Sequence, residues 1–250
     1  MKKGALVRMI AFGVCAVVAS LASAATAPAG PGENVMSGGA AKSVVHYVNP
    51  AALDVAKIIA PPPKEGSIAA LADLEAVLAV QTWCTSEQIA WAKRIERDEI
   101  FNHASILGSW FKKENLPLTT AFFTDLGEDL RALDAVAKKP FLRPRPSAID
   151  RRVEPCVSVP ASTSYPSGSA LQAFVWAEIL ADLFPEKKED VMARAHRVAW
   201  GRVIGGVHFP SDLVAGRVLA EAFLKECDKS RAFRDALEMS RREIAVFATK

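Results

Sequence analysis

The stretch GSALQAFVWAEIL, residues 168–180, gives the clearest indication of the fold class. Its apolar residues recur at the spacing of three and four that places side chains on one face of an α-helix: Leu171, Phe174, Val175 and Ile179. A tight Pro-Ser-Gly turn comes directly before the apolar residues and marks where the helix opens. The stretch therefore predicts an amphipathic helix that packs against a core.

The same period of about 3.6 residues appears in other parts of the chain, both before and after this stretch. It is carried by Leu71, Leu74 and Leu78, by Phe122, Leu126, Leu130 and Leu133, by Val214, Val218 and Phe223, and by an amphipathic stretch over residues 233–247. Alternation with a period of two, which would indicate strands, is nowhere sustained, and no internal repeat is present. We therefore predict an all-α fold, with a single helical bundle domain over residues 67–250.

The N-terminal part of the chain differs in composition from the rest. Three basic residues precede an apolar run over residues 9–22, which ends in the small-x-small pattern Ala22-Ser23-Ala24. This pattern predicts a secretory signal peptide over residues 1–24, with an uncleaved membrane anchor as the alternative. We expect a periplasmic or secreted protein without stable membrane insertion after cleavage. Residues 25–66, rich in Ala, Gly and Pro, predict an irregular lead-in to the domain.

The charge of the chain bears on nucleic-acid binding, and its cysteine content bears on disulfide pairing. The predicted signal peptide holds three of the 31 basic residues and none of the 28 acidic ones, so the remaining chain is formally neutral. A neutral chain gives no indication of a nucleic-acid-binding face. Cys84, Cys156 and Cys227 remain after cleavage, and this odd number leaves at least one unpaired in a monomer while their pairing stays open.

The first patch with chemical content is AKKPFLRPRP, residues 137–146. Its four cations, interrupted by prolines, cannot continue a regular helix. Arginine provides forked contacts to phosphate and lysine a point charge, so the patch is suited to phosphate recognition. Taken alone, it could equally be a solvated basic loop. The cations are Lys138, Lys139, Arg143 and Arg145.

The second patch is the turn in SYPSGSALQAF, residues 164–174. Gly168 allows the backbone to approach a ligand closely. A helix that begins near Ser169 would also present free N–H groups and the positive end of its dipole to an anion. An ordinary serine-capped helix start is the alternative.

The third patch is WGRVIGGVHFPSD, residues 200–212. His208 and Asp212 are four residues apart, so a helix that starts between them would place both side chains on one face. A carboxylate on one ring nitrogen fixes the tautomer and leaves the other nitrogen free to attack a substrate. A buried structural histidine with a helix-capping aspartate is the alternative for an isolated pair.

Together, the three patches resemble the tripartite motif of the bacterial class A non-specific acid phosphatases, within the type 2 phosphatidic acid phosphatase superfamily. That motif reads K-x6-RP, then PSGH, then SR-x5-H-x3-D. The matching residues are Lys138 and Arg145-Pro146, then Pro166-Ser167-Gly168, and then Arg202, His208 and Asp212. The resemblance covers about residues 61–245 and implies an all-α bundle, in agreement with the periodicity.

The resemblance also implies a role for each matching position. His208 would be the nucleophile that takes the phosphoryl group as phosphohistidine, and Asp212 would orient it. The phosphate oxygens would be bound by Lys138, Arg145 and Arg202, with Ser167 and the backbone N–H of Gly168 completing the cradle. This arrangement fits phosphoryl transfer, which depends mostly on positioning and on stabilisation of spread negative charge.

Further expectations concern ligands and neighbours of the site. The resemblance implies a small-molecule phosphate ester as substrate, with no cofactor, no metal and no nucleic-acid partner, and a homo-oligomer is compatible with it. We expect Arg143 to be a supporting cation beside the site and Lys139 to lie at the surface.

Two positions depart from the family motif. Gly201 stands where the family has serine, and Ser169 stands where the family has the histidine that protonates the leaving group. Loss of a general acid typically costs about 10²–10⁴-fold in rate. We therefore expect an acid phosphatase restricted to esters with good leaving groups, such as aryl phosphates.

Three residues, His103, Asp98 and Glu99, are candidates for a substitute acid. The other histidines, His196 and His46, are expected on a helix surface and in the lead-in. A degenerate protein that only binds oxyanions is the main alternative function. A vanadium-dependent haloperoxidase is a weaker alternative, since its chemistry also uses a histidine at the position of Ser169.

Overall fold

The computed structural model describes residues 45–248, and this part of the chain contains helices and no strand. The helices are α1 (Val55–Ile58), α2 (Ile68–Trp83), α3 (Ser86–Arg94), α4 (Ala104–Leu107), α5 (Pro117–Ala137), α6 (Pro146–Ile149), α7 (Gly168–Leu183), α8 (Lys188–Ile204), α9 (Pro210–Cys227) and α10 (Arg231–Ala248). Short 3₁₀ turns connect some of them: η1 (Pro50–Ala52), η2 (Ile95–Arg97), η3 (Ile100–His103) and η4 (Pro185–Lys187). The prediction of an all-α fold is confirmed.

Local sequence signals account for where several of these helices begin. Ser67 caps α2 by accepting a hydrogen bond from the backbone N–H of Ala70, and Thr85 forms a reciprocal capping box with Gln88 at the start of α3. Ser167 caps α7 in the same way. Helices α5 and α9 begin with proline, whose fixed φ suits the first helical position.

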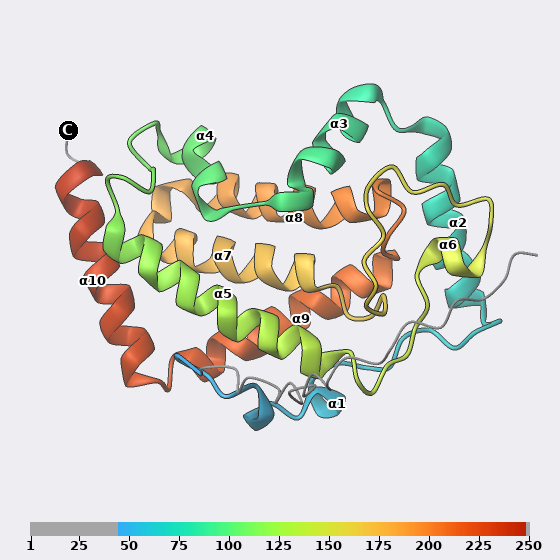
Figure 1. The fold of residues 1–250 in the computed structure, drawn as a ribbon, viewed down its shortest axis with the longest axis horizontal. Coiled ribbons are helices and arrows are strands. Elements are labelled where there is room, and N and C mark those ends of the chain that lie inside the picture. The colour runs from blue at the N-terminus through green and yellow to red at the C-terminus, as the bar shows by residue number, and fades with distance from the viewer. Residues whose placement is uncertain (1–44, 249–250) are drawn as a thin grey trace, which may run out of the picture. The chain divides into compact units, whose positions relative to one another are not determined.

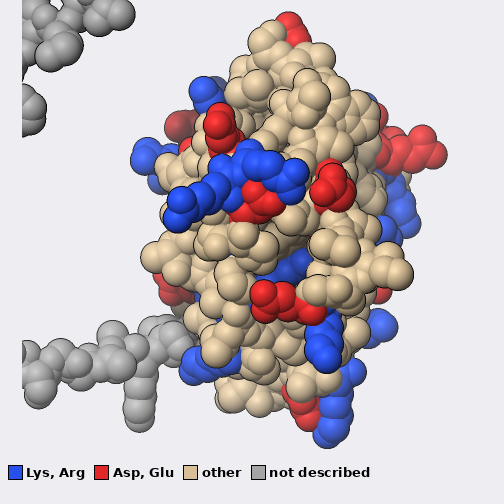
Figure 2. Space-filling view, turned by 90° about the vertical axis from the view of Figure 1, so that its right-hand side faces the viewer, with Lys and Arg blue, Asp and Glu red and all other residues tan. Residues whose placement is uncertain are grey.

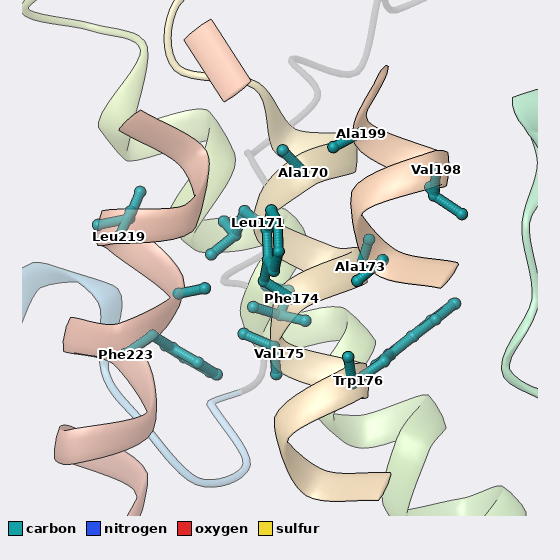
Figure 3. Close-up of a cluster of buried hydrophobic side chains, with 14 of the residues drawn as sticks. Ala170, Leu171, Ala173, Phe174, Val175, Trp176, Val198, Ala199, Leu219 and Phe223 are labelled. Carbon is teal, nitrogen blue, oxygen red and sulfur yellow. The ribbon is translucent and has the colours of Figure 1, made fainter. Parts of the chain in front are cut away.

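The core is built around α7, which packs between α8 and α9 and also contacts α5 (Figure 1). The stripe predicted from the sequence is buried, since Leu171, Phe174, Val175 and Ile179 are each at most 4% exposed. Figure 3 shows several of these side chains beside Val198 of α8 and Leu219 and Phe223 of α9. Helix α10 lies across one end of this bundle and packs on α5 (Figure 1).

Two other predicted stripes are buried only in part: Phe223 of α9 is fully buried, and Leu74 and Leu78 of α2 pack on the core, but at least one residue of each stripe is exposed. In α2, Leu71 is 55% exposed, whereas Val77 and Val80 are buried. In α9, Val214 is 65% exposed, whereas Leu213 is buried. The helices exist as predicted, but their orientation depends on partners that the local pattern does not reveal.

Residues 45–66, within the predicted lead-in, contain η1 and α1 and pack on the bundle through buried residues such as Val48. The backbone N–H groups of His46, Tyr47 and Val48 donate to the carboxylate of Asp129 on α5 at 2.7–3.0 Å. These bonds fix the segment at its N-terminal end. The predicted signal peptide, residues 1–24, lies outside the described residues.

Within residues 45–248, no single helix is both long enough and apolar enough to cross a membrane, and only the bent pair Ile68–Trp83 and Ser86–Arg97 passes by length and composition. The three cysteines of the described chain are free thiols. On the face shown in Figure 2, side chains of both charges are interspersed, and basic side chains are visible within a recess that has acidic side chains at its edge.

Candidate active site

A cavity of about 390 Å³ lies between the C-terminal half of α5, the first turns of α7 and the C-terminal half of α8, with η2 at its rim. Segments that are distant in the sequence therefore meet around one space. Six of the eight residues predicted for the site line this cavity: Lys138, Arg145, Gly168, Ser169, Arg202 and His208.

The turn between α8 and α9 places the histidine. Gly206 has a φ of 71°, a left-handed conformation that glycine adopts at little cost. The chain then reverses, and Pro210 starts α9 two residues after His208. As a result, His208 and Asp212 face each other at the start of α9, as the spacing of four predicts.

The two ring nitrogens of His208 have different partners. Nδ1 lies 3.3 Å from Oδ2 of Asp212, and Nε2 lies 3.1 Å from Nη1 of Arg145. Because a guanidinium group can only donate, Nε2 must accept, which puts the proton of the neutral ring on Nδ1. Burial lowers the pKa of His208 to about 4, although Asp212 opposes this shift. The ring is therefore neutral above that pH and has a lone pair on the nitrogen required for nucleophilic attack.

Asp212 is fully buried and its two oxygens are both engaged. Oδ2 accepts from the backbone N–H of Phe209 at 2.8 Å and from the hydroxyl of Ser164 at 2.5 Å, in addition to its contact with His208. Burial alone would raise the pKa of this carboxyl, but the contacts with His208, Arg143 and Ser164 hold it below its ordinary value. The carboxylate is thus fixed in position and charged.

Arg143 lies behind the His–Asp pair and is not among the residues that line the cavity. Its guanidinium bridges Asp212 and Asp73, at 2.7 Å from each, and stacks 3.9 Å from the ring centre of Phe209. This buried bridge connects α2 to the start of α9 and holds Asp212. Lys139 is exposed.

The cations of the cavity are largely withdrawn from water. Lys138 donates to the backbone oxygen of Pro166, and Arg145 donates from Nε to the backbone oxygen of Ser162 at 2.9 Å. Burial lowers the pKa of Lys138 and that of Arg202, and lowers the pKa of Arg145 to about 10.

Arg202 is the most informative of these cations. It is 4% exposed, and its Nε and Nη1 are buried without a hydrogen-bond partner among the described residues. An unsatisfied buried donor typically costs about 1–3 kcal/mol, and more when the group is charged. An oxyanion bound between Arg202, Arg145 and Lys138 would supply the missing acceptors and reduce the repulsion between the cations.

The turn before α7 contributes backbone and small side chains. Ser167 is fully buried and caps the helix instead of lining the cavity, and its N–H donates to the backbone oxygen of Asp212 at 3.0 Å. Gly168 and Ser169 form the first turn of α7, where N–H groups have no acceptor within the helix. The cradle expected from the sequence therefore includes the helix N-terminus at Gly168, but the hydroxyl of Ser167 is directed to capping.

None of the three substitute acids suggested by the sequence is placed to donate a proton. His103 is buried outside the cavity, with Nδ1 2.8 Å from the backbone oxygen of Ile100, and burial lowers its pKa to about 4. Asp98 lines the cavity, but both of its oxygens are engaged by Arg194 at 2.5 and 2.9 Å. Glu99 borders a neighbouring pocket.

The two remaining histidines lie away from the cavity. His196 is exposed on α8 with its ring 5.0 Å from that of Phe174. His46 lies in the segment before η1, 2.9 Å from a carboxylate oxygen of Glu128.

A carboxyl that sequence reasoning missed does line the cavity. Asp134 lies on α5 one turn before Lys138, and its Oδ1 is 3.2 Å from the lysine Nζ. The spacing of four between an acidic and a basic residue was a signal available in the sequence. Its placement beside Gly168 was not.

Gly201, where the family motif has serine, is closely approached by Ile95 of η2. A Cβ atom at this position would lie 2.7 Å from Cδ1 of Ile95. The absence of a side chain at position 201 therefore lets the region around η2 approach α8 closely and close this side of the cavity.

Comparison with known proteins agrees with this arrangement. Residues 121–231 match the profile of the PAP2 superfamily, and this range contains all of the motif residues described above. This part of the chain is therefore similar to the PAP2 superfamily. The match begins within α5 and ends at the first residue of α10, so it leaves out α1 to α4 and nearly all of α10.

Similarity to individual proteins extends beyond the matched range. A non-specific acid phosphatase of Providencia stuartii is 26% identical over 226 residues, covering 86% of this chain and 89% of that protein. A non-specific acid phosphatase of Salmonella typhimurium is 30% identical over 114 residues, or 44% of this chain and 46% of that protein. An acid phosphatase of Zymomonas mobilis is 31% identical over 81 residues, or 32% and 31% of the two chains. The predicted relationship to the acid phosphatases is thus confirmed.

Proposed function

We propose that this protein is an acid phosphatase that hydrolyses small-molecule phosphate monoesters through a phosphohistidine intermediate. The observation that carries the proposal is the buried guanidinium of Arg202, whose Nε and Nη1 have no hydrogen-bond partner among the described residues, in the same cavity as His208. An oxyanion site beside a neutral, oriented imidazole is the arrangement that phosphoryl transfer to histidine requires.

The steps follow from the contacts. The phosphoryl group binds among Lys138, Arg145 and Arg202, with the N-terminus of α7 providing additional N–H donors. His208 Nε2 attacks phosphorus while Asp212 holds Nδ1–H and stabilises the positive charge that develops on the ring. Water then attacks the phosphohistidine, which releases inorganic phosphate and restores the imidazole.

The acidic working range of such an enzyme agrees with the burial of its nucleophile. Because the pKa of His208 is lowered to about 4, the imidazole stays neutral and nucleophilic in mildly acidic solution. Export to the periplasm or medium is part of this proposal and rests on the signal-like pattern of residues 1–24.

Rapid-quench labelling tests the proposal directly. We expect that mixing the protein with ³²P-labelled 4-nitrophenyl phosphate at pH 5 traps an acid-labile, alkali-stable label, and that peptide mapping locates it at His208. The contrary result is that calorimetry detects phosphate binding, but the protein is not labelled and no 4-nitrophenol is released. That result would identify a protein that only binds oxyanions. This is the second function compatible with the cavity, because Ser169 stands in the place of an acid.

A further inference from the structure

The leaving group of the reaction needs a proton, and a carboxyl that lines the cavity is placed to supply it. Asp134 borders the cavity from α5, and Gly168 at the start of α7 lies against its carboxyl group. A Cβ atom at position 168 would be only 2.5 Å from Oδ1 and 2.7 Å from Cγ of Asp134. The carboxyl is therefore held beside the backbone of the residue that precedes Ser169.

The carboxyl of Asp134 has one charged partner among the described residues, the ammonium group of Lys138. Oδ1 is buried and makes no hydrogen bond with any described residue, and Lys138 approaches it to 3.2 Å while directing a hydrogen bond to Pro166. Asp98, the other carboxyl nearby, is held by Arg194. Glu96, a third carboxyl of the lining, accepts a hydrogen bond from Ser158, which holds its pKa below the ordinary value and makes it a poorer proton donor. Among the described carboxyls of the cavity, Asp134 is therefore the best placed to carry a proton.

Charged groups of both signs face this carboxyl. The cations Arg131, Lys138 and Arg145, from α5 and the loop after it, line the same cavity as this carboxyl. Arg202 of α8 and His208 of the turn before α9 also line it. The region of η2 adds Glu96, Arg97 and Asp98 at the rim. Burial raises the pKa of Asp134 above its ordinary value, although Lys138 and Arg145 oppose the shift. A bound phosphate, being negatively charged, would raise it further.

We propose that Asp134 is the general acid of this site, in the role that the resemblance gives to a histidine at the position of Ser169. This inference rests on the proposed function. As His208 Nε2 forms its bond to phosphorus, the bond between phosphorus and the ester oxygen breaks, and that oxygen takes the proton of the Asp134 carboxyl. In the second half-reaction, the Asp134 carboxylate takes a proton from the attacking water, and inorganic phosphate leaves.

This assignment changes the substrate range expected from the sequence. With Ser169 as the only candidate, alkyl phosphates would be poor substrates, because an alkoxide is a poor leaving group without protonation. With Asp134 as the acid, alkyl and aryl phosphates are both hydrolysed at mildly acidic pH. For alkyl esters, kcat/KM should fall at higher pH as Asp134 loses its proton.

The test compares Asp134→Asn with the wild-type protein on two esters, β-glycerophosphate and 4-nitrophenyl phosphate. We expect the variant to lose about 10²-fold or more in kcat on the alkyl ester and less than about tenfold on the aryl ester, whose leaving group needs no proton. Asp125→Asn, which removes a carboxylate from the same helix outside the cavity, is the matched control and should leave both rates unchanged. A second variant, Asp134→Asn with Ser169→His, should regain much of the alkyl activity.

Equal losses on the two esters would overturn the assignment, because a residue that only positions Lys138 affects both substrates alike. The wild-type protein provides a test that does not depend on folding of the variant. Hydrolysis of the aryl ester without hydrolysis of the alkyl ester would show that no acid operates and would overturn the assignment while leaving the proposed function intact. Hydrolysis of neither ester would overturn both.

Discussion

Replacing His208 with alanine is expected to lower kcat for 4-nitrophenyl phosphate by about 10⁴–10⁶-fold, the loss typical when a nucleophile is removed from a preorganised site. The aryl ester is the appropriate substrate, because its leaving group makes the rate depend on the nucleophile and little on a general acid. The residual rate should be that of a substrate held among the three cations, with water as the nucleophile.

The control for this substitution is His196→Ala, which removes an exposed histidine from α8 and should change kcat by less than about twofold. Calorimetry should show that inorganic phosphate still binds to the His208→Ala protein, since Arg202, Lys138 and Arg145 remain. A His208→Ala protein that retains more than about a tenth of wild-type kcat would rule out the phosphohistidine mechanism.

The sequence predicted some buried helix faces correctly and others wrongly. The apolar spacing in α7 identified buried residues correctly, because α7 is surrounded by α5, α8 and α9 and its stripe could only be internal. In α2 and α9 the same reasoning selected Leu71 and Val214, which are exposed. In these helices the position of the partners decides which apolar residues are buried, and the local pattern does not contain that position.

The sequence alone also fails to identify the residues that support the site through contacts with distant helices. The resemblance to the tripartite motif predicts that Lys138, Arg202 and His208 share one site. The structure places all three around one cavity. Asp73 could not be found in this way, because its contact with Arg143 joins residues 70 positions apart and depends on the docking of α2. The place of Asp134 in the cavity could not be predicted from the sequence either, since it depends on the approach of Gly168 from another helix.

The Asp73–Arg143–Asp212 bridge provides the second large effect that we predict. Asp212→Asn should lower kcat by about 10⁴-fold, the magnitude seen when a buried aspartate that orients a catalytic histidine becomes an amide. An asparagine that keeps its oxygen toward the N–H of Phe209 and the Nδ1–H of His208 turns its amide group toward Arg143, where two donors then meet. If the amide instead flips, the imidazole is driven into the wrong tautomer, with its proton on Nε2.

Because the change also weakens a buried ion pair, lost stability must be separated from lost orientation. Asp73→Asn is the matched variant: it removes the other carboxylate of Arg143 and contacts neither Asp212 nor His208. We expect it to lower the midpoint of urea unfolding as Asp212→Asn does, but to reduce kcat by less than about tenfold. Similar losses of kcat in the two variants would mean that Asp212 acts only by supporting the fold.

The pH profile supplies a readout that a purely structural role would not move. Asp212 raises the pKa of His208 against the effect of burial, so the wild-type kcat/KM should fall as the pH drops through about 4 and the ring becomes protonated. Removing the carboxylate takes away this opposing effect, and the residual activity of Asp212→Asn should therefore persist to lower pH than in the wild type. Asp73→Asn should keep the wild-type acid limb, since the carboxylate beside the imidazole is still present. An acid limb that is unchanged in Asp212→Asn would show that the group titrating near pH 4 is not the imidazole of His208.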